Sequence, residues 1–379
     1  MPCLDGVVLT FHETAQSIYN DNKVATKLPH GERVAYLIDH LGAVCSNLGK
    51  TMFIRTFAYE PEELGYIREG INMAKADFIV MSKEVPHDWQ PYYPNNPLIG
   101  AFPEKKQVIE FDLGHEYLGL ARVPYINIDY VVNRLNYGIS KNMYGAVLRI
   151  ERLKWRTVDT PNQATIDVFT KMLSDTTLVA HKLYKNWLEN RYGKEAVPYL
   201  FSAFMRTEEI TDKALFTLGF WVSDHSLLPD YDYAIGHMKW LTTAKWDPNY
   251  KKLEQELFNP TRKTLQKIAD EKDKAMELVE ASIEDINKAK PYLSDADYDE
   301  LMMYFSRSKA MVTVWKYAML AIYGIDVYNN TKDNQDRRAL LNTTERMMIE
   351  VDRNRLELID MASHYCAPNH MAISMLHTE

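Results

Sequence analysis

The sequence has few cysteines, no long apolar run and no cluster of positive charge. Its three cysteines, Cys3, Cys45 and Cys366, are odd in number and far apart, so no disulfide framework is expected. The longest apolar runs, such as 319–323, are much shorter than a membrane span. The formal net charge is −8 and lysines and arginines form no run, which argues against nucleic acid and membrane surfaces as partners. No signal peptide is visible, so the compartment stays open between cytoplasm and periplasm.

The chain has the length and composition of a globular protein with two domains. It contains 379 residues, of which 46% are hydrophobic and 25% charged. Residues 1–156 alternate between strand-like and helix-like patterns, whereas residues 157–379 carry only helical patterns. We therefore expect an α/β domain over 1–156 and a helical domain over 157–379.

The alternating part predicts parallel βα units. The expected strands are 6–11, 51–59, 78–81, 108–113 and 143–150, and the expected helices are 31–48, 62–74 and 128–137. This makes about five βα units, whereas a closed (β/α)8 barrel needs eight. The prediction is therefore part of a TIM barrel that lacks its first units, followed by the helical domain. A truncated gene product, which would aggregate on its own, is one interpretation of that pattern.

Several helices of the second domain have recognisable ends. The segment 159–161 (DTP) predicts a helix start, because a capping side chain precedes proline. A helix is expected over 260–290, and another after the cap at Ser294, ending at Gly324. A last helix is expected over 336–364. The methionine and aromatic stripes on these helices predict core or homodimer interface rather than a cofactor site.

Charged residues follow the ends of the predicted strands, where βα barrels carry their chemistry. They are Glu13, Arg55, Lys83, Asp88 and Glu116, and this shared position predicts a single site. Hydrolysis of a glycosidic bond needs a proton donor and a second carboxylate, and three of these residues are acids.

The strand expected at 108–113 carries acids on one face. Glu110 and Asp112 alternate with apolar residues, so their side chains share a face, and Glu116 joins them if the extended backbone continues. Aromatic residues such as Trp89 and Tyr117 follow the same strands and suit a sugar-binding cleft, since a flat ring stacks on a sugar.

Two segments resemble motifs of the family 67 α-glucuronidases. The segment 83–91 (KEVPHDWQP) resembles their "KxGPxDFQ", which places a catalytic aspartate at Asp88. The segment 114–119 (GHEYLG) resembles their "TQEYxGQ", which places a catalytic glutamate at Glu116.

Two further segments extend the resemblance towards the N-terminus. The segment 52–59 resembles "WRAFxY" and places the family's arginine at Arg55. The segment 6–13 resembles "GxxxKxDSEG" and places the general acid at Glu13. Over 157–379 the resemblance is limited to helical character and length.

The resemblance implies an inverting exo-hydrolase that removes a terminal sugar or uronic acid from a plant-type oligosaccharide or polysaccharide such as xylan. Glu13 would be the acid, and Asp88, Glu116 or both would serve the attacking water, with carboxyl groups roughly 6.5–9.5 Å apart. The resemblance implies no cofactor or metal. It does imply a homodimer formed through the helical domain. In the implied enzyme, Arg55 and Lys83 would hold the substrate. The aromatic residues Trp89 and Tyr117 are further candidates for sugar binding, and His12, His87 and His115, which the family does not explain, would hydrogen-bond sugar hydroxyls or neighbouring acids.

Three departures from the family, one of which is the lack of the front of the barrel and of the family's leading domain, leave other interpretations open. Leu9 stands where the family has a lysine, and the acid's neighbours are Phe11-His12-Glu13-Thr14 in place of "DSEG". The change at Leu9 weakens glucuronate specificity more than hydrolysis and, with the incomplete barrel, favours a catalytically inactive glycan-binding or interaction module.

Each of the three acids also follows a histidine directly, and imidazole with carboxylate can bind a metal. Two facts argue against a metal site. Adjacent residues of an extended chain point to opposite sides, and the sequence has no HExxH motif.

Overall fold

The computed structural model describes most of the chain. The described residues are 3–12, 17–20, 24, 26–152, 155–222, 225–229, 231–240 and 243–355, without the side chains of 237–240 and 351–355. Two compact units are present. Unit 1 comprises 1–112 and 133–149, and unit 2 comprises 113–132 and 150–379. Each unit is described separately.

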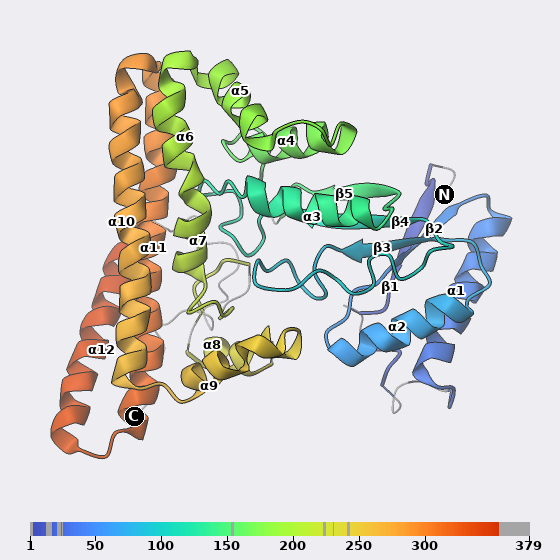
Figure 1. The fold of residues 1–379 in the computed structure, drawn as a ribbon. Helices are drawn as coiled ribbons and strands as arrows, with labels where there is room; N and C mark the ends of the chain where they lie inside the picture. The colour runs from blue at the N-terminus through green and yellow to red at the C-terminus, as the bar shows by residue number, and fades with distance from the viewer. Residues whose placement is uncertain are drawn as a thin grey trace. The chain divides into compact units, whose positions relative to one another are not determined.

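Unit 1 is built on a parallel sheet of five strands in sequential order, β1-β2-β3-β4-β5. Helices alternate with the strands, as predicted (Figure 1). The elements are β1 (Gly6–Thr10), α1 (His30–Asn47), β2 (Thr51–Arg55), α2 (Pro61–Met73), β3 (Ile79–Lys83), β4 (Gln107–Asp112), α3 (Ile128–Ser140) and β5 (Gly145–Arg149). The α/β prediction is confirmed at this level, with α3 beginning in unit 2.

Burial decreases from the middle of this sheet towards its edges. Every residue of β4 is buried on both faces, as expected for a central strand of a parallel sheet. In the edge strands, Val8 of β1 is 54% exposed and Val147 of β5 is 40% exposed. The predicted alternation of 107–113 therefore does not separate a solvated face from a core face.

Helices α1 and α2 pack closely because glycine lies at their crossing. A Cβ atom on Gly70 of α2 would lie 2.3 Å from Cγ1 of Val34 in α1, far inside van der Waals contact. Pro61 lies in the first turn of α2, where a proline fits because its missing N–H would have no helical partner. Glu63 in that turn accepts hydrogen bonds from the backbone N–H groups of Tyr59 and Glu60 at 2.8 and 2.9 Å.

Unit 2 is mainly helical. Apart from the hairpin of β6 (Glu151–Arg152) and β7 (Trp155–Arg156), its elements are helices with short 3-10 turns. The helices are α4 (Gln163–Ser174), α5 (Ala180–Tyr192), α6 (Val197–Met205), α7 (Thr207–Leu215), α8 (Tyr231–Trp240), α9 (Lys251–Phe258), α10 (Arg262–Ala289), α11 (Asp295–Asn330) and α12 (Asn334–Arg355).

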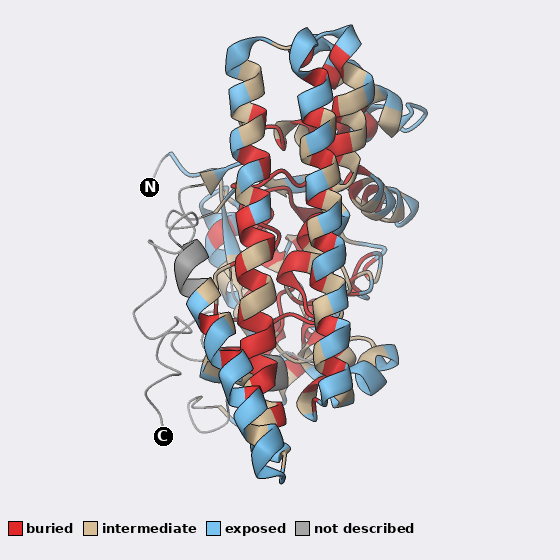
Figure 2. Ribbon diagram, turned by 90° about the vertical axis from the view of Figure 1, so that its left-hand side faces the viewer, coloured by how far each residue is buried: buried red, intermediate tan, exposed pale blue. Residues whose placement is uncertain are grey.

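The long helix α11 is the core of unit 2. Its apolar residues pack against α7, α10 and α12, and Figure 2 shows buried residues along the facing sides of the long helices. By length and composition α11 could cross a membrane, but 72% of its most apolar window is buried inside the structure, as in the core helix of a folded domain. The prediction that the stripe of Leu301, Phe305 and Trp315 is core is confirmed.

Three predicted helix ends can be compared with the structure. Ser294 caps α11 by accepting the backbone N–H of Asp297 at 3.1 Å, as predicted. The predicted stop at Gly324 is wrong, because α11 continues to Asn330. At the predicted start 159–161, the Thr160 hydroxyl ahead of Pro161 accepts the backbone N–H of Asn162 at 3.2 Å, and α4 itself begins at Gln163. The last predicted helix is present as α12, and its predicted part beyond residue 355 lies outside the described residues.

Candidate functional site

The carboxyl ends of four neighbouring strands in unit 1 each place a charged residue at the same edge of the sheet. Arg55 ends β2, Lys83 ends β3, Asp112 ends β4 and Arg149 ends β5. The strand register sets Lys83 beside Glu110, and Asp112 beside Arg149. In parallel α/β sheets this edge is the usual place for ligands.

An ion pair spans β3 within this edge. The Nε and Nη2 atoms of Arg55 donate to the two carboxylate oxygens of Glu110 at 2.8 and 3.0 Å. Both side chains are largely buried, with 17% and 10% exposed. The bidentate geometry uses both carboxylate oxygens of Glu110 and two of the guanidinium nitrogens of Arg55.

Lys83 holds Asp88 at the same edge. Its side chain is 4% exposed and its ammonium group forms an ion pair with Asp88, whose side chain is 16% exposed. The ammonium also lies 4.0 Å from the ring centre of Phe57 and 3.9 Å from that of Trp89. Two aromatic rings therefore fix the cation, and the cation fixes a carboxylate that reaches solvent.

The Trp89 ring contacts cations of the protein and does not offer an open surface on which a sugar could stack. Its residue is 4% exposed, and the guanidinium carbon of Arg149 lies 4.8 Å from its ring centre, in addition to the Lys83 ammonium. The indole therefore positions charged groups of the protein at this edge.

His87 and His12 are buried and engaged with protein groups. Nδ1 of His87 lies 2.8 Å from the carbonyl oxygen of Ala58, and its ring stacks on Phe57. Burial lowers the pKa of His87, despite the opposing effect of Asp88. Nε2 of His12 lies 2.8 Å from Glu63 at the start of α2. Burial opposes ionisation of Glu63, but hydrogen bonds from His12 and the backbone leave its pKa lower than usual.

Glu84, directly after β3, is a buried acid of a different kind. It is 5% exposed, and burial raises its pKa to about 8, with Arg134 opposing the rise and Asp112 adding to it. Among the described residues, its Oε2 atom has no hydrogen-bond partner. Glu84 is therefore mostly protonated at neutral pH.

In unit 2, Glu116 is held by a cation and a histidine. Nε of Arg152 donates to Oε1 of Glu116 at 2.8 Å, and Nε2 of His225 lies 2.9 Å from the same oxygen. The Ser226 hydroxyl donates to the Glu116 carbonyl and accepts the N–H of Gly119, at 3.0 and 2.9 Å. The loop is thus fixed around a carboxylate that is 3% exposed.

The sequence predicts that Glu116 shares the face of Glu110 and Asp112 if the backbone stays extended as far as Glu116, and the backbone does not stay extended. The extended backbone ends at Asp112, and His115 has φ +57°. His115 is fully buried against Tyr125, and burial lowers its pKa to about 3.

Tyr117 packs on protein rings. Its ring contacts Trp221 edge to face, with 4.6 Å between ring centres, and lies 6.1 Å from the ring of His225. Because Tyr117 is only 5% exposed, it supports the loop that carries Glu116.

No family model matches this chain, and a search of curated proteins finds no match.

The expected general acid, Glu13, lies outside the described residues. Within the described part of the chain, no group of three or more histidine, cysteine, aspartate and glutamate side chains is arranged to hold a metal ion. Of the histidines before Asp88 and Glu116, His87 contacts the carbonyl oxygen of Ala58 and His115 packs against the ring of Tyr125.

Sequence reasoning missed several residues that build these two arrangements. Arg149 ends a predicted strand, so the rule that selected Arg55 and Lys83 would have included it. Arg152 lies two residues after the same predicted strand and carries the same signal, whereas His225 comes from a loop of the helical region far along the chain. Only the folded chain brings these two side chains to Glu116.

Proposed function

We propose that the protein is a glycoside hydrolase related to the α-glucuronidases, acting with inversion on a terminal sugar or uronic acid of a plant-type oligosaccharide. Unit 1 would be part of a (β/α)8 barrel. The observation that carries the proposal is the Lys83–Asp88 pair, which holds a partly exposed carboxylate at the carboxyl edge of a parallel sheet.

Asp88 suits the activation of water. The buried ammonium of Lys83 fixes the carboxylate in one position, and its 16% exposure leaves it accessible to solvent. Arg55 and Arg149 add guanidinium groups at this edge, which suit a hydroxyl-rich ligand. In this proposal His87, Trp89 and His12 position neighbouring groups rather than touch the sugar.

Glu116 and Glu13 are assigned to the reaction by the sequence resemblance alone. Glu116 would share the activation of water, with Arg152 and His225 fixing its carboxylate. Glu13 would protonate the leaving oxygen, the second role that hydrolysis with inversion requires.

The second candidate is a glycan-binding or interaction module of the same fold without turnover. It is favoured by the fact that Asp88 and Glu116 are both ion-paired with protein cations, as purely structural acids are.

The deciding experiment measures hydrolysis of 4-nitrophenyl glycosides and glucuronoxylan fragments by the protein and by its Asp88→Asn and Glu116→Gln variants. Each variant should lower kcat by about 10²–10⁴-fold, the usual contribution of a general acid or base, while ligand binding remains measurable. Proton NMR of the first product should show the inverted anomer.

The matched controls are Asp77→Asn, an exposed acid before β3, and Glu189→Gln, an exposed acid of unit 2. Both should retain full activity. Turnover equal to that of the unmodified protein in either site variant would refute the assignment, and ligand binding without turnover by the unmodified protein would favour the second candidate.

A further inference from the structure

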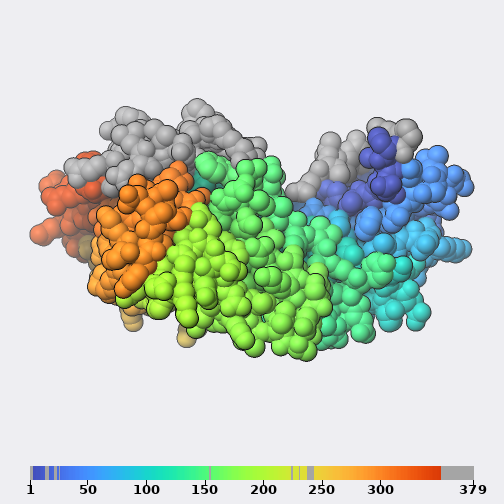
Figure 3. Space-filling model, turned by 90° about the horizontal axis from the view of Figure 1, so that it is seen from above, coloured from blue at the N-terminus to red at the C-terminus, as the bar shows by residue number. Residues whose placement is uncertain are grey.

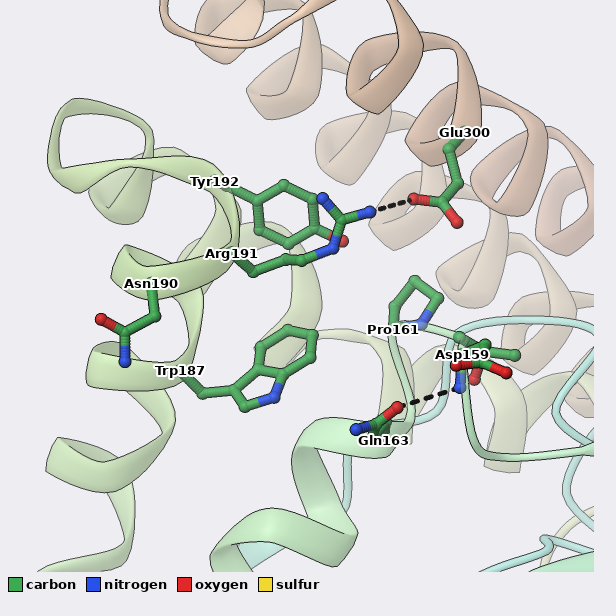
Figure 4. Close-up of a pocket in the computed structure, with 9 residues that line it drawn as sticks. Asp159, Pro161, Gln163, Trp187, Asn190, Arg191, Tyr192 and Glu300 are labelled. Carbon is green, nitrogen blue, oxygen red and sulfur yellow. Dashed lines mark hydrogen bonds and ion pairs between the residues drawn. The ribbon is translucent and has the colours of Figure 1, made fainter.

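A pocket of about 430 Å³ lies within unit 2, in the size range of small-molecule sites. Its walls come from three places: α5, the start of α11, and the loop that leads into α4 (Figure 4). In the space-filling view of Figure 3, the orange turn between α10 and α11 lies beside the yellow-green helices of the same unit. No residue of this pocket belongs to the arrangements around Asp88 or Glu116.

The aromatic wall of this pocket is held in a fixed orientation. The indole N–H of Trp187 donates to Asp167 at 2.8 Å, so the ring cannot turn freely. The indole ring is nearly parallel to the ring of Tyr184, with 6.5 Å between ring centres and 20° between planes, and Tyr192 meets it edge to face. Trp187 is half-buried and lines the pocket, so part of this fixed indole is accessible to a ligand there.

The charged side chains of the pocket already have partners of opposite charge. Arg191 donates to Asp297 at 2.5 Å and to Glu300 at 3.0 Å (Figure 4 shows the second bond). The carboxylate of Asp159 pairs with Arg156 at 2.8 Å. A strongly charged ligand would have to break these pairs, which favours a ligand without net charge.

The pocket also offers polar groups that do not carry charge. The side-chain oxygen of Gln163 accepts the backbone N–H of Asp159 at 2.9 Å, which orients the amide so that its NH2 group remains a donor. Asn190 contributes a second amide from α5. A fixed aromatic face surrounded by amides, carboxylates and a guanidinium matches a pyranose ring, which has an apolar C–H face and a rim of hydroxyl groups.

We propose that this pocket binds a segment of a neutral oligosaccharide, with a pyranose ring stacked on Trp187 and its hydroxyl groups bonded to Arg191, Glu300 and Gln163. The inference rests on the pocket itself and does not depend on the proposed hydrolysis.

The test uses the full chain carrying Asp88→Asn, with xylohexaose and cellohexaose as probes. The indole N–H signal of Trp187 in the NMR spectrum, assigned by its loss in Trp187→Phe, should shift on addition of at least one probe. Because this signal reports on one pocket, binding elsewhere on the protein does not produce it. Calorimetry should show that Trp187→Ala weakens this binding by about tenfold or more, whereas Trp187→Phe retains most of it.

The control is Tyr292→Ala, which removes an exposed aromatic ring of unit 2 that does not line the pocket. It should leave the affinity unchanged, and circular dichroism should show that all variants are folded. If the Trp187 signal does not move with either sugar at millimolar concentration, or Trp187→Ala binds as the parent does, the inference is wrong. A moving Trp187 signal without hydrolysis by the unmodified protein would overturn only the proposed hydrolase function.

Discussion

Replacing Glu84 with glutamine should make the protein more stable at alkaline pH. The side chain is 5% exposed, directly after β3, and burial raises its pKa from 4.5 to about 8, against the opposing charge of Arg134. Glutamine has nearly the same shape and stays neutral at every pH. The glutamine side chain can still accept the hydrogen bond from the backbone of Asp112. The Oε2 position has no partner among the described residues, so the new amide loses no bond there.

The sign of the effect follows from the direction of the pKa shift. The folded state binds the Glu84 proton more tightly than the unfolded state, so its contribution is complete below about pH 4.5 and is lost as the pH rises towards 8. Each pH unit in that window removes up to about 1.4 kcal/mol from the free energy of unfolding. The full loss is therefore on the order of 4–5 kcal/mol, and Glu84→Gln does not suffer it.

Urea unfolding at pH 5, 7 and 9 measures this effect. The two proteins should be similar at pH 5, and the advantage of Glu84→Gln should grow by several kcal/mol up to pH 9. The matched control is Glu104→Gln, which removes the same charge at an exposed position of unit 1. A difference between Glu84→Gln and the parent that stays constant from pH 5 to pH 9 would refute the argument.

Three further substitutions test contacts that stabilise each unit internally, each by urea unfolding at pH 7. Arg55→Met leaves the Glu110 carboxylate, which is 10% exposed, without its bidentate partner, and should cost about 3–5 kcal/mol. Lys272→Met removes a fully buried ammonium that donates to the carbonyls of Lys213 and Phe216 at the end of α7, and should cost about 2–4 kcal/mol. Gly70→Ala places a Cβ 2.3 Å from Val34 and should cost about 1–3 kcal/mol.

Each of these has a partner variant that separates the mechanism from general damage. Adding Glu110→Leu to Arg55→Met should recover much of the loss, because no buried charge then remains. Lys274→Met, at a side chain 51% exposed on the same helix, should have little effect. Gly65→Ala, on the same helix as Gly70 with nothing within 4 Å, should stabilise by about 0.5–1 kcal/mol. Equal effects within any pair would contradict the corresponding mechanism.

The helix ends show where local sequence signals succeed and fail. The cap at Ser294 and the proline at the start of α2 were predictable because both signals act within one turn of the helix. Gly324 was misjudged as a stop signal. A Cβ there would lie 2.9 Å from the Thr344 hydroxyl oxygen, so the glycine allows α12 to pack closely on α11. The sequence around Gly324 contains no trace of that distant neighbour.

Lys272 shows that burial in the core, too, can depend on distant partners that the local sequence does not reveal. A lysine in a helix rich in charged residues is expected on the solvent-exposed face of that helix. The other lysines in this part of the sequence lead to the same expectation. The structure instead buries Lys272 fully, because its ammonium meets carbonyl groups left open at the end of α7. Burial of such a group depends on partners that lie more than 50 residues away.

The sequence by itself determined the parallel strand–helix alternation of unit 1, the helical character of unit 2 and the placement of Arg55, Lys83 and Asp88 at or just after strand ends. These features depend on side-chain periodicity and on residues within one turn or one strand. Only the tertiary structure decided which charges are paired, that Trp89 covers cations, and that Arg152 and His225 hold Glu116. Such contacts join segments distant in the chain, and their partners are selected by packing and charge rather than by local pattern.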